Sequence, residues 1–201
     1  MKIKGGERIK RLINRGFTLI ELLIVMAILG VLAVVVLVAM NPVQQLARTR
    51  DTGRKSSVTQ VGRALEAYYT SHGGRYLTVA NCGTGGVLRE DWMSCLRESG
   101  ELSIPVANIT YNTTLATACI SQSVASIVHV SHNGFCYAAG ASGSPAIVYA
   151  RLESASDRSK CTVAGNTIPY FVWSTLQGRG GLFCGPDIGG VPAPGTITFT
   201  D

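Results

Sequence analysis

The sequence predicts an α+β fold in which a long amino-terminal α-helix, half transmembrane and half amphipathic, packs on a small antiparallel β-sheet head. Three observations lead there. Residues 17–40 form an apolar run with one charged residue, Glu21. Residues 41–72 carry apolar side chains at helical spacing. Residues 124–200 hold short β-branched and aromatic segments separated by Gly, Ser and Asn. The 201 residues leave room for one compact domain beyond the apolar run.

The apolar run is long enough to cross a bilayer. At roughly 1.5 Å per residue it would extend about 36 Å, against a hydrocarbon core of about 30 Å. Residues 1–16 hold six Lys or Arg and one acid, so the positive-inside rule keeps them in the cytoplasm and exports the carboxyl-terminal part. An ordinary secretory signal would have a shorter apolar region, and a lipoprotein signal would need a cysteine well before Cys82. We therefore expect a single-pass anchor in the cytoplasmic membrane.

Glu21 is the unusual feature of this run. A carboxylate near the centre of a membrane helix costs roughly 2.5 to 3.5 kcal/mol. We therefore expect Glu21 to have a function and a partner of opposite charge.

The stretch "RGFTLIELLIVMAILGVLAVV" resembles the class III signal of type IV pilins and pseudopilins, with a basic leader ending at Gly16, an aromatic Phe17 and Glu21 five residues after the glycine. The resemblance implies a pilin-like fold and a leader comprising residues 1–16. It also implies that a prepilin peptidase cuts between Gly16 and Phe17 and methylates the new amine of Phe17.

The amine created by that cut is complementary to Glu21. It is positively charged at neutral pH, and at about 4 Å with an effective dielectric near 20 the attraction is on the order of 4 kcal/mol. The residues themselves leave open whether Phe17 pairs with Glu21 of its own chain or of a neighbour. The resemblance implies the neighbour, in which case Glu21 places an incoming subunit during assembly.

Residues 41–72 are predicted to be helical. Pro42 either kinks one continuous helix or begins a second one. Val58, Val61, Leu65 and Tyr68 or Tyr69 form an apolar stripe that we expect to pack under the sheet. The basic residues around the stripe are interpreted as solvated surface or as a contact with another subunit, and the helix should end between residues 71 and 74.

The head is expected to span residues 73–201. Residues 75–120 correspond to the variable region of pilins and contain one helical candidate, 87–96. An antiparallel sheet and tail should occupy 124–200, with strands at 126–130, 134–139, 146–152 and 168–174 and a possible edge strand at 196–200.

All six cysteines lie in the head, which favours disulfides formed in an oxidising compartment. They are Cys82, Cys95, Cys119, Cys136, Cys161 and Cys184. The absence of Cys-x-x-Cys argues against a zinc site, and 15 pairings remain open. The resemblance suggests Cys161–Cys184, since many pilins bracket their carboxyl-terminal region with a disulfide.

Few other residues indicate chemistry, and we expect neither an enzyme nor a cofactor. His129 and His132 would face opposite sides of a strand and are interpreted as polar surface. Asp187 and Asp201 lie in the tail, where pseudopilins bind calcium, but two acids do not define a site. Residues 177–181, "QGRGG", are read as a turn. Residues 77–201 hold six basic and eight acidic residues, so nucleic-acid binding is not expected of the head.

The sequence therefore predicts a structural subunit of a type IV pilus that polymerises into a helical filament for adhesion, twitching motility or DNA uptake. Its expected partners are further copies of itself and related pilins, the prepilin peptidase, the assembly platform and the inner membrane. After assembly it would lie in a cell-surface or periplasmic filament. A type II secretion pseudopilin and a membrane-anchored binding module that never polymerises are the alternatives.

Overall fold

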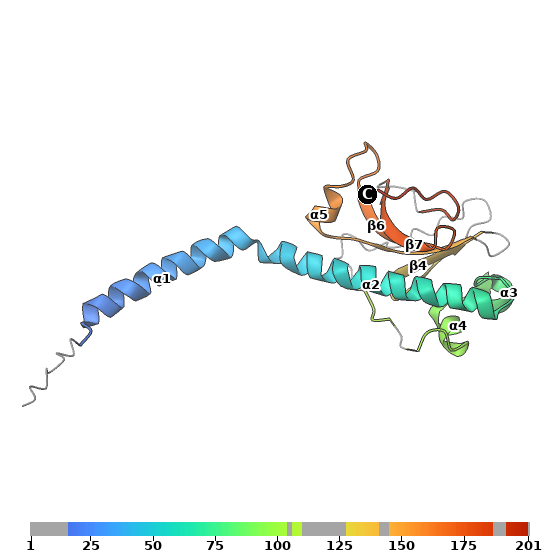
Figure 1. Cartoon of the computed structure of the whole chain (residues 1–201), viewed down its shortest axis with the longest axis horizontal. Coiled ribbons are helices and arrows are strands. Elements are labelled where there is room, and N and C mark those ends of the chain that lie inside the picture. The colour runs from blue at the N-terminus through green and yellow to red at the C-terminus, as the bar shows by residue number, and fades with distance from the viewer. Residues whose placement is uncertain (1–15, 104–105, 110–127, 141–144, 187–191, 201) are drawn as a thin grey trace, which may run out of the picture. The chain divides into compact units, whose positions relative to one another are not determined.

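The computed structural model describes residues 16–103, 106–109, 128–140, 145–186 and 192–200. The chain divides into two compact units between Pro42 and Val43 (Figure 1). The first unit contains helix α1, Leu19–Met40. The second contains helix α2, Pro42–Ser71, and the whole head.

The boundary between the two helices lies at Asn41. This residue has a left-handed backbone, with φ of 40°, and ends α1. Pro42 follows as the first residue of α2, where its missing N–H removes no helical hydrogen bond. The structure thus has two helices rather than one helix running through the proline.

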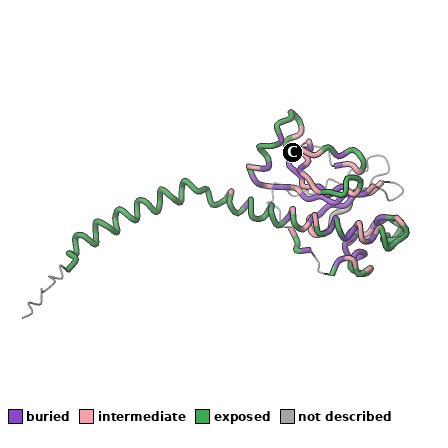
Figure 2. The backbone as a smooth tube through the Cα atoms, viewed as in Figure 1, coloured by how far each residue is buried: buried purple, intermediate pink, exposed green. Residues whose placement is uncertain are grey.

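Helix α2 forms as its apolar spacing predicts. Val58, Val61, Leu65 and Tyr68 are all buried. Figure 2 colours the buried residues of the chain purple. The helix ends at Ser71, and Gly73 and Gly74 both have positive φ, as a helix stop requires.

The region after α2 is built from short elements. They are helix α3 (Val79–Cys82), a hairpin of β1 (Gly83–Thr84) and β2 (Val87–Leu88), and helix α4 (Met93–Glu98). The helix expected at 87–96 is therefore shorter and later, because the Gly85–Gly86 turn commits residues 87–88 to the hairpin. Trp92 and Leu96 are fully buried and attach α4 to the core.

The main sheet is a five-stranded antiparallel meander in the order β3-β4-β5-β6-β7. Its strands are β3 (Val128–His132), β4 (Phe135–Ala139), β5 (Ala146–Arg151), β6 (Ile168–Ser174) and β7 (Arg179–Gly185). The one-turn helix α5, Ala155–Arg158, lies between β5 and β6. Four of the five strands match the predicted segments to within two residues at either end.

Alternation along the strands gives the sheet two apolar faces. Phe135, Tyr137, Val148 and Trp173 form the inner core with the stripe of α2. The phenol of Tyr137 donates a 2.9 Å hydrogen bond to the carbonyl of Leu77, which ties the chain after α2 to the sheet.

The outer face of the sheet carries a second core. Ile147, Tyr149 and Tyr170 are buried there, and the carboxyl-terminal segment covers them with Ile197 and Phe199. Residues 196–200 were expected to be an edge strand, and they are not one. They lie over the sheet instead, because Ile197 and Phe199 can bury more apolar surface there than on an edge.

Strand β7 was missed in the sequence, where residues 177–181 looked like a turn. Of residues 177–181, only 177 and 178 belong to the turn. Arg179 already pairs with Ser174. Glycines weaken strands unless something packs on them. A Cβ at Gly180 would overlap the ring of Phe171, and one at Gly181 would overlap Phe199, so these glycines make room for aromatic rings.

Candidate functional site: the amino-terminal motif

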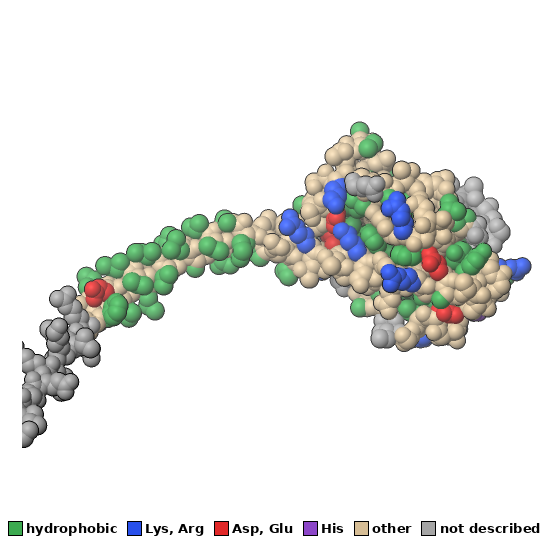
Figure 3. All heavy atoms as spheres, viewed as in Figure 1, with side chains coloured by type: hydrophobic (Ala, Val, Ile, Leu, Met, Phe, Trp, Pro, Cys, Tyr) green, Lys and Arg blue, Asp and Glu red, His purple; other side chains and the backbone are tan. Residues whose placement is uncertain are grey.

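Helix α1 is not covered by any part of the chain that the structure describes. None of its residues is buried, and its hydrophobic side chains extend along its length (Figure 3). A helix that is apolar on every side must be covered by lipid or by other helices. It is the one described helix long and apolar enough to cross a membrane, and it fits a membrane anchor.

The first turn of α1 is closed by a capping box between Thr18 and Glu21. The backbone N–H and the hydroxyl of Thr18 both donate to Glu21 Oε2, at 2.9 and 2.7 Å. In return, Thr18 Oγ1 accepts the N–H of Glu21 at 3.2 Å. Such a box satisfies two of the otherwise unpartnered N–H groups at a helix start.

The capping box gives Glu21 a role that the sequence interpretation missed. Thr-x-x-Glu before an apolar run is itself a sequence signature of a helix start, so the signal was present. Oε2 carries the box, while Oε1 makes no hydrogen bond to any residue that the structure describes. Glu21 can therefore cap its own helix and still present an acceptor to an external cation.

The predicted cleavage site lies directly before this turn. Gly16 and Phe17 are outside α1, and Phe17 is 85% exposed. A Cβ at Gly16 would meet nothing within 4 Å, so no packing within the described residues requires glycine there. Cleavage between Gly16 and Phe17 stays a prediction.

The cysteines that the structure describes form disulfides, as the sequence predicted. Cys82 is bonded to Cys95 and Cys161 to Cys184. Cys136 in β4 is also in a disulfide, and Cys119 lies outside the described residues. The first bond joins α3 to α4, and the second ties the loop after α5 to β7.

The remaining sequence candidates do not come together as a site. Among the described residues no three His, Cys, Asp or Glu side chains could hold a metal ion. Asp187 and Asp201 lie outside the part of the chain that the structure describes. His132 differs from the polar surface expected of it, because its Nδ1 atom is buried and has no hydrogen-bond partner.

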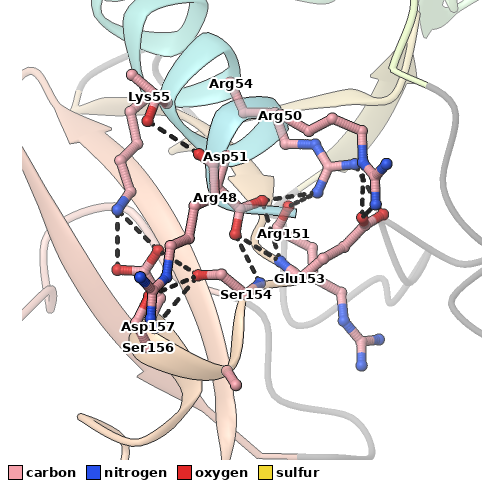
Figure 4. A network of polar contacts seen from close by, with 12 residues as sticks. Arg48, Arg50, Asp51, Arg54, Lys55, Arg151, Glu153, Ser154, Ser156 and Asp157 are labelled. Carbon is pink, nitrogen blue, oxygen red and sulfur yellow. Dashed lines mark hydrogen bonds and ion pairs between the residues drawn. The ribbon is translucent and has the colours of Figure 1, made fainter. Parts of the chain in front are cut away.

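Part of the basic face of α2 is used inside the chain rather than left to solvent (Figure 4). Arg54 is 4% exposed and pairs with Asp51 at 3.0 Å and with Glu153 at 2.7 Å. The carboxylate of Asp51 also accepts the backbone N–H groups of Glu153 and Ser154. Arg50 pairs with Glu153 from the exposed side, at 3.1 Å.

A second pair continues this ion cluster toward α5. Lys55 Nζ donates to both carboxylate oxygens of Asp157 at 2.8 Å, and Ser154 Oγ donates to the same carboxylate at 2.9 Å. Two of the acids that pair with the basic residues of α2, Glu153 and Asp157, thus come from the β5–α5 segment of the same chain, and the third, Asp51, comes from α2 itself. Arg48 and Arg63 remain exposed on α2.

A comparison with family models matches the prokaryotic N-terminal methylation motif to residues 11–37. This motif is the class III signal of type IV pilins and pseudopilins, and the chain carries it. The match spans the Gly16–Phe17 junction, the capping box and most of α1. It indicates a structural protein of the pilin or pseudopilin class. No curated protein and no solved structure matches the chain.

Proposed function

We propose that the chain is a prepilin whose mature form is a structural subunit of a type IV pilus. The leader comprises residues 1–16, the prepilin peptidase cuts between Gly16 and Phe17, and the new amine of Phe17 is methylated. The observation that carries the proposal is a lone carboxylate, Glu21, in the first turn of a helix that is apolar and exposed on every side.

The physical argument rests on what the cut produces. It removes a leader with six basic residues and one acid and keeps α1 as the anchor. It also creates an ammonium group four residues before Glu21. The capping box supports a pairing with a neighbouring subunit, since Oε2 is already held by Thr18 and Oε1 points to no partner in its own described chain.

Polymerisation supplies the cover that α1 lacks. Repeated contacts that do not close on themselves make helical filaments, and a bundle of α1 helices would bury the apolar surface that lipid covers before assembly. The disulfide-rich head would form the outer surface of the filament, where adhesion, twitching motility or DNA uptake takes place. Its partners are other pilins, the peptidase and the assembly platform of the inner membrane.

The test is the intact mass and amino-terminal sequence of the chain from membranes and from sheared surface filaments. We expect methylated Phe17 as the first residue in the sheared fraction. Chains with methylated Phe17 in short periplasmic filaments alone would identify the type II secretion pseudopilin. Chains that begin at Met1 and stay in membranes beside an active peptidase would contradict the proposal and identify an anchored binding module.

Two variants separate assembly from processing. Glu21→Gln removes the charge and should abolish filaments while leaving cleavage and the membrane pool intact. Glu90→Gln, an exposed acid of the head, is the matched control and should assemble normally. Normal filaments from Glu21→Gln would show that the carboxylate has no part in assembly.

A further inference from the structure

The head contains a small polar cavity that the proposed function does not use. It has a volume of about 220 Å³ and lies between α4 and the turn that joins β3 to β4. Asp91, Ser94 and Arg97 line it from the α4 side, and His132 and Asn133 line it from the turn.

The turn side of the cavity is held in place by the backbone. Asn133 and Gly134 both have positive φ, at 52° and 79°, as in a tight two-residue hairpin. The side-chain amide of Asn133 donates to the backbone carbonyl of Val106. The backbone carbonyl of Asn133 accepts the N–H of Ile109. These contacts hold the turn that directly follows His132.

Two buried polar atoms line this cavity without a hydrogen-bond partner. They are Nδ1 of His132 and Oγ of Ser94, a residue that is 6% exposed. Ser94 Oγ lies near the carboxylate of Asp91, but not in the geometry of a formed hydrogen bond. Buried polar atoms are rarely left unpaired in folded proteins, so these two atoms point to a missing partner.

The charges around the cavity restrict what that partner can be. Arg89 donates to Asp91 at 3.0 and 2.8 Å, and this contact lowers the pKa of Asp91 to about 2. Burial lowers the pKa of His132, and the nearby charges of Asp91 and Arg97 raise and lower it, respectively. Arg97 attracts a negatively charged group, and Asp91, although it is paired with Arg89, attracts a positively charged one. The charged residues of the lining, Asp91 and Arg97, therefore fit a ligand that carries both charges.

The apolar part of the cavity lining is called its floor. Met93, Leu102 and Val106 line it and are each less than 9% exposed. We propose that the cavity binds a free α-amino acid with an apolar side chain. Its ammonium group faces Asp91, its carboxylate faces Arg97, and its side chain lies on the apolar floor. His132 and Ser94 provide the remaining hydrogen bonds.

The experiment uses the full chain in detergent micelles, with ¹⁵N-labelled histidine, and follows the His132 ring signals by NMR. The probe is L-leucine. Two analogues each lack one charge: 4-methylpentanoate has no ammonium group and 3-methylbutylamine has no carboxylate. We expect a saturable shift with leucine, and binding of each analogue weaker by about tenfold or more, the usual effect of losing one charge-assisted hydrogen bond.

Variants locate the binding to the cavity. Arg97→Gln and Asp91→Asn should each weaken leucine binding by about tenfold. Arg158→Gln and Glu90→Gln remove exposed charges outside the cavity and should leave it unchanged. Arg97 makes no ion pair within the described residues, so Arg97→Gln remains informative even if loss of the Arg89–Asp91 pair loosens the fold.

The proposal is overturned if leucine causes no saturable shift up to its solubility limit, which would mean that ordered water alone fills the cavity. It is also overturned if an analogue binds as well as leucine, or if Arg97→Gln binds normally. None of these results depends on processing or filament assembly, so they leave the pilin proposal untouched.

Discussion

Gly62 lies where α2 packs against Trp173 of the sheet. A Cβ at this position would overlap the indole ring of Trp173. The same indole donates its Nε1–H to Glu66 at 3.1 Å, one turn further along α2. The glycine therefore lets a large aromatic ring of β6 lie flat on the helix.

The effect of filling this position can be separated from helix propensity. We expect Gly62→Ala to lower the free energy of unfolding by about 1 to 3 kcal/mol, because Trp173 must move. Gly53 is the matched control, since it lies in the same helix with nothing within 4 Å of a Cβ. Gly53→Ala should be neutral or stabilise by up to about 1 kcal/mol. Urea unfolding measures both, and equal effects would contradict the clash.

Arg54 is the central residue of the ion cluster. We expect Arg54→Ala to destabilise the head by about 3 to 5 kcal/mol, because it leaves the carboxylates of Asp51 and Glu153 buried without their main cation. Arg48→Ala, on the exposed side of the same helix, should change stability by less than about 0.5 kcal/mol. Similar melting temperatures for the two variants would show that the cluster contributes little.

At the scale of elements, the ion cluster joins α2 to the β5–α5 segment and should make this junction sensitive to acid. Burial raises the pKa of Glu153, but its hydrogen bonds and charge interactions with Arg54 and Arg50 outweigh this, so the pKa lies below its ordinary value. A lowered pKa in the folded state stabilises the fold above the unfolded pKa, about 4.3, and the contribution is lost as the pH falls below it.

We therefore expect the melting temperature to be steady between about pH 5 and 8 and to fall below about pH 4.5. Glu153→Gln should melt at a lower temperature at neutral pH and should lose part of this acid dependence. Glu90→Gln, whose carboxylate is exposed, is the control. A variant at position 153 with the full acid dependence of the parent chain would assign the effect to other groups.

The disulfide between Cys82 and Cys95 staples the short elements after α2. It closes a separation of 13 residues, for which the chain-entropy model gives about 3 kcal/mol. Replacing both cysteines by serine should increase hydrogen exchange in α3 and α4 while the five-stranded sheet stays protected. Uniform loss of protection would mean that α4 is an integral part of the sheet's cooperative unit.

The sequence was sufficient for the elements whose pattern is local. The apolar stripe of α2 follows from its helical periodicity, and the strand at 168–174 follows from its β-branched and aromatic residues. Strand β7 could not be predicted, because Gly180 and Gly181 read as a turn until Phe171 and Phe199 are seen packed against them. The burial of Arg54 was also out of reach, since its partner Glu153 lies 99 residues away. The cavity at His132 likewise depends on contacts between distant segments.

At the scale of the whole molecule, the core of the head is complete without α1. The two apolar clusters draw all their buried residues from position 58 onward. We expect residues 43–201 exported to an oxidising compartment to fold as a soluble monomer with the melting temperature of the full chain. Aggregation of this fragment, with its disulfides formed, would show that α1 contributes to the stability of the head.

The meander order of the sheet has a consequence for how the chain is made. Each strand from β4 to β7 pairs with the one synthesised just before it. The sheet can therefore form strand by strand while the chain leaves the ribosome or is exported across a membrane. The apolar stripe of α2 stays exposed in the growing chain until β4 and β5 have been synthesised and can pack on it. The disulfide between Cys161 and Cys184 can form only after β7 has been synthesised. It therefore covalently links the head only when the last strand of the sheet is in place.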